Sequence, residues 1–261
     1  MWLLLHCILF TVLLVLLILY LASSSDFLEK FLHEATCHLK KLGGGAVFAT
    51  IEANVFRTKT NDSVNITEGD IKSICKTKLR ASVTNVVIYI SYLHQKVLST
   101  INQKKFAFMD PTAITASAYS SSKLTRDLIA RMDITNAELV FVPYVKNNQR
   151  VWWLDSQGGH QDKEIDKIMR RVVEGCLKKR HSSGSTVFGF PQHIPQHKNN
   201  WESVFYAMRF MKEIIEGKLK LNSTVIVSTH CTLLKNSKYD EEDITEVRRE
   251  WVNHVLPLLV T

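Results

Sequence analysis

Apolar residues recur three and four positions apart along several stretches of the chain. In the most regular stretch Val204, Met208 and Met211 form one apolar stripe, while charged residues occupy the other faces. This spacing is typical of an amphipathic helix. The same pattern predicts helices at residues 26–42, 71–97 (in two pieces), 162–177, 203–219 and 244–256.

Short apolar stretches rich in β-branched and aromatic residues alternate with these helices. They lie at residues 138–144, 150–154, 186–190 and 224–228. Stretches of this length and composition predict strands. The alternation of helices and strands indicates an α/β (or α+β) fold.

The part of the chain before residue 67 is less regular. Glycines at residues 43–45 interrupt the first helical pattern, and residues 58–69 are polar and are predicted to form a loop. Thr67 and Asp70 have the spacing of a capping box that opens a helix. The predicted organisation is an anchor or signal peptide at 1–25, a linker with a short helix at 26–66, and a globular domain at 67–261.

The N-terminus carries an almost unbroken apolar segment, which begins at Trp2 and ends at Ala22. Its length matches the roughly 20 residues needed to cross a bilayer and exceeds the usual 7–15 or so of a signal-peptide core. It therefore predicts a single-pass membrane anchor. A cleaved signal peptide is the alternative, because small residues follow at 22–25. The sequons at Asn61, Asn65 and Asn222 matter only if the chain enters the secretory lumen.

The composition favours one globular domain and argues against nucleic-acid binding and against a metal or cofactor site. The chain has 261 residues, 46% hydrophobic and 22% charged, which suffices for one globular domain with a full core. Its net charge of +8 is spread along the chain without interleaved aromatics, so nucleic-acid binding is not expected, and an acidic partner is compatible. The five cysteines show neither CxxC spacing nor a cluster with histidine, so no metal site or cofactor is predicted.

Ser203 is the first candidate for chemistry, because it stands at the start of the most regular predicted helix. There it lies near the positive end of the helix dipole. A serine at such a position is also an ordinary N-cap. Position alone therefore leaves both interpretations open.

The surrounding residues resemble the nucleophile region of the ubiquitin-like-protein-specific proteases, the SUMO-deconjugating cysteine proteases, in the branch common among plant transposon-associated genes. The matching residues are Trp201, Glu202, Tyr206, Met208, Arg209, Phe210 and Met211. Segments 105–111, 139–144, 153–156 and 244–251 also appear in the family's order, so the resemblance covers about residues 71–256. It implies a papain-like cysteine-protease fold, cysteine-type peptidase activity, and a ubiquitin-like modifier or its conjugate as partner.

The chain departs from the family at the residues that carry catalysis. Ser203 stands where the family has its catalytic cysteine, and His197 stands where it has the glutamine that helps form the oxyanion hole. Asp155 matches the aspartate that orients the catalytic histidine. These three residues are the family's catalytic positions in this sequence.

The family's histidine has no counterpart. In the family, a His-Trp pair follows the Val-Pro-Tyr strand and precedes the strand that ends in Leu-Asp-Ser. Here about one strand with its turn is missing before Gln149, and aligning Val151 and Trp152 to the pair instead puts a valine at the base position. Loss of a central strand would also weaken the sheet around residues 146–150.

A serine hydroxyl needs a general base to act as a nucleophile, so we expect a catalytically impaired protein, a pseudoenzyme. Trp152, Trp153 and Trp201 could still form a platform for a modifier, although aromatic residues are more often core. An active peptidase with a substitute base (His160, His193 or His197) and a membrane-anchored interaction protein are the alternatives. The predicted location is a membrane, or the nucleus or cytoplasm if the apolar leader is an artefact of the gene model. An exon missing between Asn148 and Gln149 would explain the lost strand.

Overall fold

The computed structural model describes residues 24–43, 45–99, 106–112, 125–126, 128–130, 139–141, 145–147, 150–152, 167–172, 174–175, 187–189, 194–218 and 238–260. Its helices are α2 (Ser24–Lys41), α3 (Ala53–Phe56), α4 (Glu68–Cys75), α5 (Val83–Leu98), α9 (Ser203–Ile215) and α10 (Glu241–Val260). Its strands are β1 (Val47–Ile51), β2 (Asp62–Ile66), β3 (Phe106–Phe108), β4 (Leu139–Phe141), β5 (Val145–Asn147), β6 (Arg150–Trp152) and β7 (Val187–Gly189).

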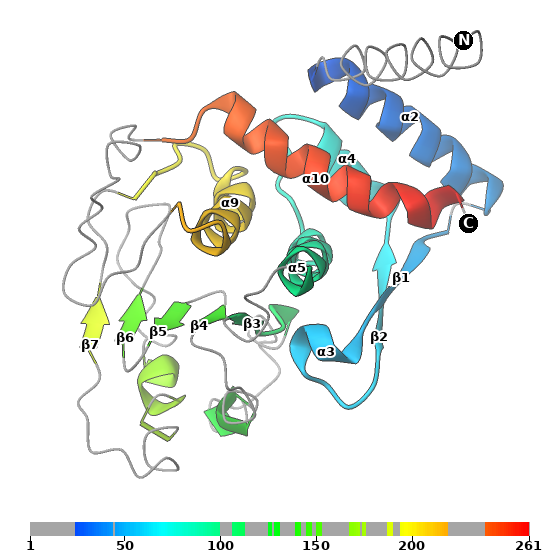
Figure 1. Cartoon of the computed structure of the whole chain (residues 1–261). Coiled ribbons are helices and arrows are strands. Elements are labelled where there is room, and N and C mark those ends of the chain that lie inside the picture. The colour runs from blue at the N-terminus through cyan, green and yellow to red at the C-terminus, as the bar shows by residue number, and fades with distance from the viewer. Residues whose placement is uncertain are drawn as a thin grey trace, which may run out of the picture.

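A five-stranded sheet with the order β3-β4-β5-β6-β7 forms one layer. The outer pairs β3–β4 and β6–β7 are parallel, whereas β4–β5 and β5–β6 are antiparallel. Figure 1 shows α5 and α9 on one side of this sheet, with α10 running across them. The alternation of helices and strands predicted an α/β arrangement of this kind, and the structure confirms it.

Strand β5 corrects the prediction that a central strand is missing. Val145–Asn147 pairs antiparallel with β4 on one side and with β6 on the other, so the sheet has no gap between them. Because this strand is only three residues long and carries Lys146 and Asn147, it lacks the apolar pattern by which a strand is usually predicted.

A second correction concerns residues 58–69, which were predicted to form a loop. They contain β2, which pairs antiparallel with β1 as a separate two-stranded sheet. On β1 alternate residues are buried, and Phe48 on the opposite face is 68% exposed. Strand β2 carries mostly polar residues that show no strand pattern of their own. It is a strand because it pairs with β1, whose alternate residues are buried.

One hydrophobic core joins the helices and both sheets, and it extends from Leu28 in α2 to Leu259 in α10. Trp251 is fully buried in it, and its indole N–H donates to the Asn85 carbonyl at 3.2 Å. The predicted capping box is confirmed: the Asp70 N–H donates to the Thr67 hydroxyl, and the Asp70 carboxylate accepts from the Thr67 N–H. The domain boundary near Thr67 stays a prediction, but α2 contacts α4 and α10 within this core.

The membrane anchor also stays a prediction, because residues 2–22 lie outside the described part of the chain. Within that part, no helix combines the length and the apolar content that a bilayer span requires.

Ion pairs fix α9 against α10. Arg209 donates to Asp243 at 2.8 Å and also pairs with Glu246. Lys212 lies within 2.6 Å of Glu246 and within 2.8 Å of Glu250. Both cations are buried although the sequence pattern placed them on the polar face of the helix. This network holds the helix that begins at Ser203 in a fixed position relative to α10.

The network makes stability depend on acidic pH. Burial by itself would raise the pKa of Glu246, but the hydrogen bonds from Lys212 and Arg209 outweigh it and lower that pKa to about 2. Since the unfolded chain titrates near 4.5, the stabilisation from Glu246 is complete above that pH and is lost as the pH falls toward 2. Asp243 opposes this trend, because burial raises its pKa.

We therefore expect the urea midpoint of unfolding to fall between pH 4.5 and pH 2.5, and to fall less in Glu246→Gln than in the parent chain. Midpoints at four pH values test this, and Glu242→Gln, whose carboxylate is exposed and pairs only with Arg249 among the described residues, is the matched control. Parallel curves for the parent and Glu246→Gln would contradict it.

Candidate functional site

Ser203 is the first residue of α9, as the sequence predicted. Its hydroxyl donates to the Asn200 carbonyl at 3.2 Å and does not accept from a helix N–H. It is therefore not an N-cap. The residue before it, Glu202, does not cap the helix either, because its carboxylate accepts from the Asn199 N–H at 3.2 Å.

His197 lies in the loop that leads to α9 and is 9% exposed. Its ring meets Tyr206 edge-on, with the ring centroids 5.4 Å apart. The Tyr206 hydroxyl accepts from the Tyr239 N–H at 3.0 Å, which ties this part of α9 to the segment before α10. Among the described residues, the Nε2 atom of His197 has no hydrogen-bond partner. The contact with Tyr206 packs His197 beside the first turns of α9.

Arg248 is the residue at this site that the sequence analysis did not single out. It projects from α10, is 2% exposed, and places its guanidinium 4.6 Å from the Phe205 ring centroid and 5.6 Å from that of Trp201. Its Nε and Nη2 atoms have no hydrogen-bond partner within the described part of the chain. Burial lowers the pKa of Arg248, and the charges of Glu241 and Glu202 partly offset this effect.

Sequence alone held one signal for Arg248. It is spaced four residues from Ile244, and three from Trp251, so it occupies a position on the apolar stripe of the predicted helix. A charged residue in an apolar stripe is a burial problem that needs a partner or a function.

The remaining predicted site residues fall outside the described residues or lack described side chains. Asp155, His160 and His193 lie outside, so their distances from Ser203 are untested. Trp153 lies outside as well, and for Trp152 only the backbone in β6 is described. Of the three tryptophans proposed as a platform, Trp201 is half-buried and packs against the core.

Strand β5 lies between two strands that belong to segments resembling the family. Segment 139–144 begins with β4, β6 precedes Asp155, and β5 lies between these strands in sequence and in the sheet. The residues of β5 are Val145, Lys146 and Asn147. Neither β5 nor β6 carries a histidine, so both alignments, with β5 or with Val151 at the position of the histidine, leave that position without one.

Other described histidines make contacts elsewhere. His94 meets Phe108 edge-on, His254 packs against Tyr92, and His33 lies 3.8 Å from the thiol of Cys37. Cys75 is buried, which raises the pKa of its thiol to about 12 and makes it a poor nucleophile. In the described part of the chain, no group of three potential ligands could hold a metal ion.

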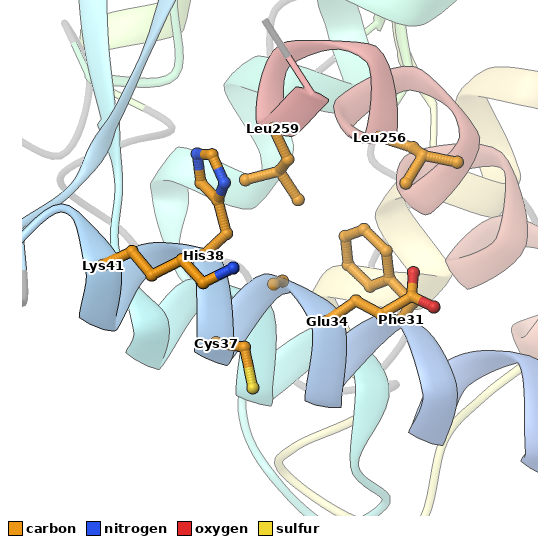
Figure 2. Close-up of a pocket in the computed structure, with 8 residues that line it drawn as sticks. Phe31, Glu34, Cys37, His38, Lys41, Leu256 and Leu259 are labelled. Atoms are coloured by element: carbon orange, nitrogen blue, oxygen red, sulfur yellow. The ribbon is translucent and has the colours of Figure 1, made fainter.

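A cavity of about 400 Å³ lies away from Ser203, between α2 and the end of α10. Figure 2 shows Leu256 and Leu259 from α10 on one side of it, and Phe31, Glu34, His38 and Lys41 from α2 on the other. Its walls come from the helices that flank the two ends of the described chain, so it does not contribute to the candidate site.

No family model and no curated protein matches the chain. Among solved structures it is similar to a de-sumoylating protease, with a TM-score of 0.57 and 12% identity, over 82% of this chain and 92% of the other. It is also similar to the C-terminal Ulp1 protease domain in complex with Smt3, the yeast ortholog of SUMO (TM-score 0.54, 12% identity, 92% and 95% covered). A third neighbour is Ulp1 with its catalytic cysteine oxidised to a sulfenic acid (TM-score 0.57, 12% identity, 92% and 94% covered). The chain therefore has the fold of these SUMO proteases, which confirms the fold that the sequence resemblance implied.

Proposed function

We propose that this chain is a catalytically impaired member of the SUMO-protease family, a degenerate copy from the transposon-associated branch, that binds a ubiquitin-like modifier without cleaving it. Two features together carry this proposal: a serine, Ser203, begins α9, and strand β5 has no histidine. The chain has the fold of the proteases, but we infer that it lacks their cysteine nucleophile and their histidine base.

Support for modifier binding comes from the surface beside Ser203. Trp201 is half-buried, and the guanidinium of Arg248 lies 5.6 Å from its ring centroid. A tryptophan fixed in this way is a favourable contact residue, because little conformational freedom is lost on binding. The net charge of +8 suits an acidic partner surface. One of the similar structures is a protease domain in complex with Smt3.

A titration of the purified chain with SUMO, followed by calorimetry, tests the proposal. We expect saturable binding that weakens about tenfold or more in Trp201→Ala, since contact tryptophans commonly contribute at least this much. Phe48→Ala is the matched control, because Phe48 is an exposed aromatic residue on β1 and not part of the site. Absence of saturable binding, or equal loss in both variants, would overturn the proposal.

An active peptidase remains the competing function. It needs a base that takes the proton of Ser203, and the histidines at 160 and 193 are the candidates outside the described residues. An electrophilic SUMO probe distinguishes the two functions, because covalent labelling that disappears in Ser203→Ala would require an activated hydroxyl.

A membrane-anchored interaction protein that binds no modifier is the third function class. We propose a single-pass membrane location through residues 2–22, with a nuclear or cytoplasmic location as the alternative. A reporter fused to residues 1–25 decides between them, because an anchor keeps the reporter in the membrane fraction after alkaline extraction.

A further inference from the structure

The loop between α4 and α5 concentrates positive charge. All five of its residues, 76–80, are exposed, and three of them are cations: Lys76, Lys78 and Arg80. The loop has no carboxylate of its own. Asp70 lies beside it, but its carboxylate accepts hydrogen bonds from Thr67 and Ser82 instead. The loop therefore presents three positive charges that are not neutralised locally.

Apolar side chains are exposed among these charges. Leu79 is 41% exposed, and Val83, the first residue of α5, is 36% exposed. An anionic membrane surface attracts such a loop in two ways, because it draws basic residues by charge and buries apolar side chains at the level of the headgroups.

The loop lies at the end of the domain that follows the apolar segment 2–22. The pKa of Glu68, the first residue of α4, is lowered by its hydrogen bond with Lys72 and also by the charge of Lys40, near the end of α2. The start of α4 is therefore close to the end of α2. Because these helices pack together, α4 runs back toward the start of α2, as Figure 1 also shows. Helix α2 itself begins at Ser24, two positions after the apolar segment.

We propose that the loop 76–80 binds an anionic lipid surface, with its three cations at the lipid headgroups and Leu79 inserted between them. This inference rests on the proposed membrane location through residues 2–22, and it goes beyond it by fixing the orientation of the domain. The start of α2 and the loop face the bilayer, while the end of α2 faces away. An acidic protein would attract the same cations, but the position of the loop beside the membrane segment favours lipid.

The test uses the full chain in vesicles of phosphatidylcholine alone and in vesicles that also contain phosphatidylserine. Leu79→dansylalanine reports on the loop, because dansyl emission moves to shorter wavelength when the group leaves water. We expect this shift only with phosphatidylserine, and its loss at high salt, which screens exposed charges. Leu42→dansylalanine is the matched control, since Leu42 is 54% exposed but follows the other end of α2. Its emission should be the same in both vesicles.

A second comparison measures the contribution of one charge. In Lys78→Gln the ratio of bound to free loop should fall about fivefold, the usual effect of one basic residue at an anionic surface. Lys41→Gln is the matched control, because it removes an exposed cation from the end of α2. It should leave the ratio unchanged.

The outcomes separate the membrane location from the loop contact. If alkaline extraction releases the chain from both kinds of vesicle, the proposed location fails and the loop contact fails with it. If the chain stays in both but residue 79 emits alike in them, the location stands and the loop contact is wrong. A shift produced by SUMO without vesicles, and not by phosphatidylserine, would show that the loop binds an acidic protein and would overturn the inference.

Discussion

Replacing Ser203 with cysteine is expected to leave the cleavage of a SUMO fusion at the background rate. A thiol at this place needs a histidine that takes its proton, and loss of the base alone costs about 10⁶-fold in a related triad. Strand β5, which lies between β4 and β6, consists of Val145, Lys146 and Asn147 and carries no histidine. Gel assays of fusion cleavage over a day, with an active SUMO protease as reference, measure the rate.

The matched control for this result is Ser203→Ala, which has no nucleophile. If the cysteine and alanine variants behave alike, the base is absent. Cleavage by the cysteine variant well above that of the alanine variant would show that another histidine serves as base, and the chain would then be a peptidase disabled at one residue only.

Replacing Trp251 with alanine is expected to lower the free energy of unfolding by about 3–5 kcal/mol, the usual cost of removing a large aromatic side chain from a core. Trp251 is fully buried on α10, and its indole N–H is bonded to the Asn85 carbonyl. For a domain of this size, that loss lowers the melting temperature by roughly 10 °C. Urea unfolding followed by circular dichroism gives the free energy directly.

Trp251→Phe removes less of the packing than Trp251→Ala. It keeps a phenyl ring in the core but removes part of the indole together with its bond to Asn85, so we expect it to cost about 1–3 kcal/mol. A loss in Trp251→Ala no larger than in Trp251→Phe would mean that the core around α10 closes over the missing ring.

The sequence predicted those helices that carry an apolar stripe or a capping signal in their own residues. Helices α9 and α10 carry long apolar stripes, and the helix after Thr67 carries its own start signal, so their positions could be predicted. Strands β2 and β5 could not be predicted in this way. Their residues are mostly polar, and they are strands because neighbouring strands offer them backbone hydrogen bonds.

In the candidate site, too, some residues could be predicted from the sequence and one could not. Ser203 and His197 were identified because they stand at fixed positions of a local motif, which a sequence displays directly. Arg248 lies 45 positions after Ser203 and reaches the site only through the packing of α10 on α9. Its role depends on a contact between distant segments, which the pattern of one helix cannot show.

Helix α10 belongs both to the hydrophobic core and to the candidate site. Trp251 is buried in the core, and Arg248 contacts Trp201 at the site. A transcript that ends before Glu241 would therefore lose folding and recognition together. If the chain is the degenerate copy that we propose, damage to this helix would abolish the whole protein, whereas loss of catalytic residues would leave a folded chain behind.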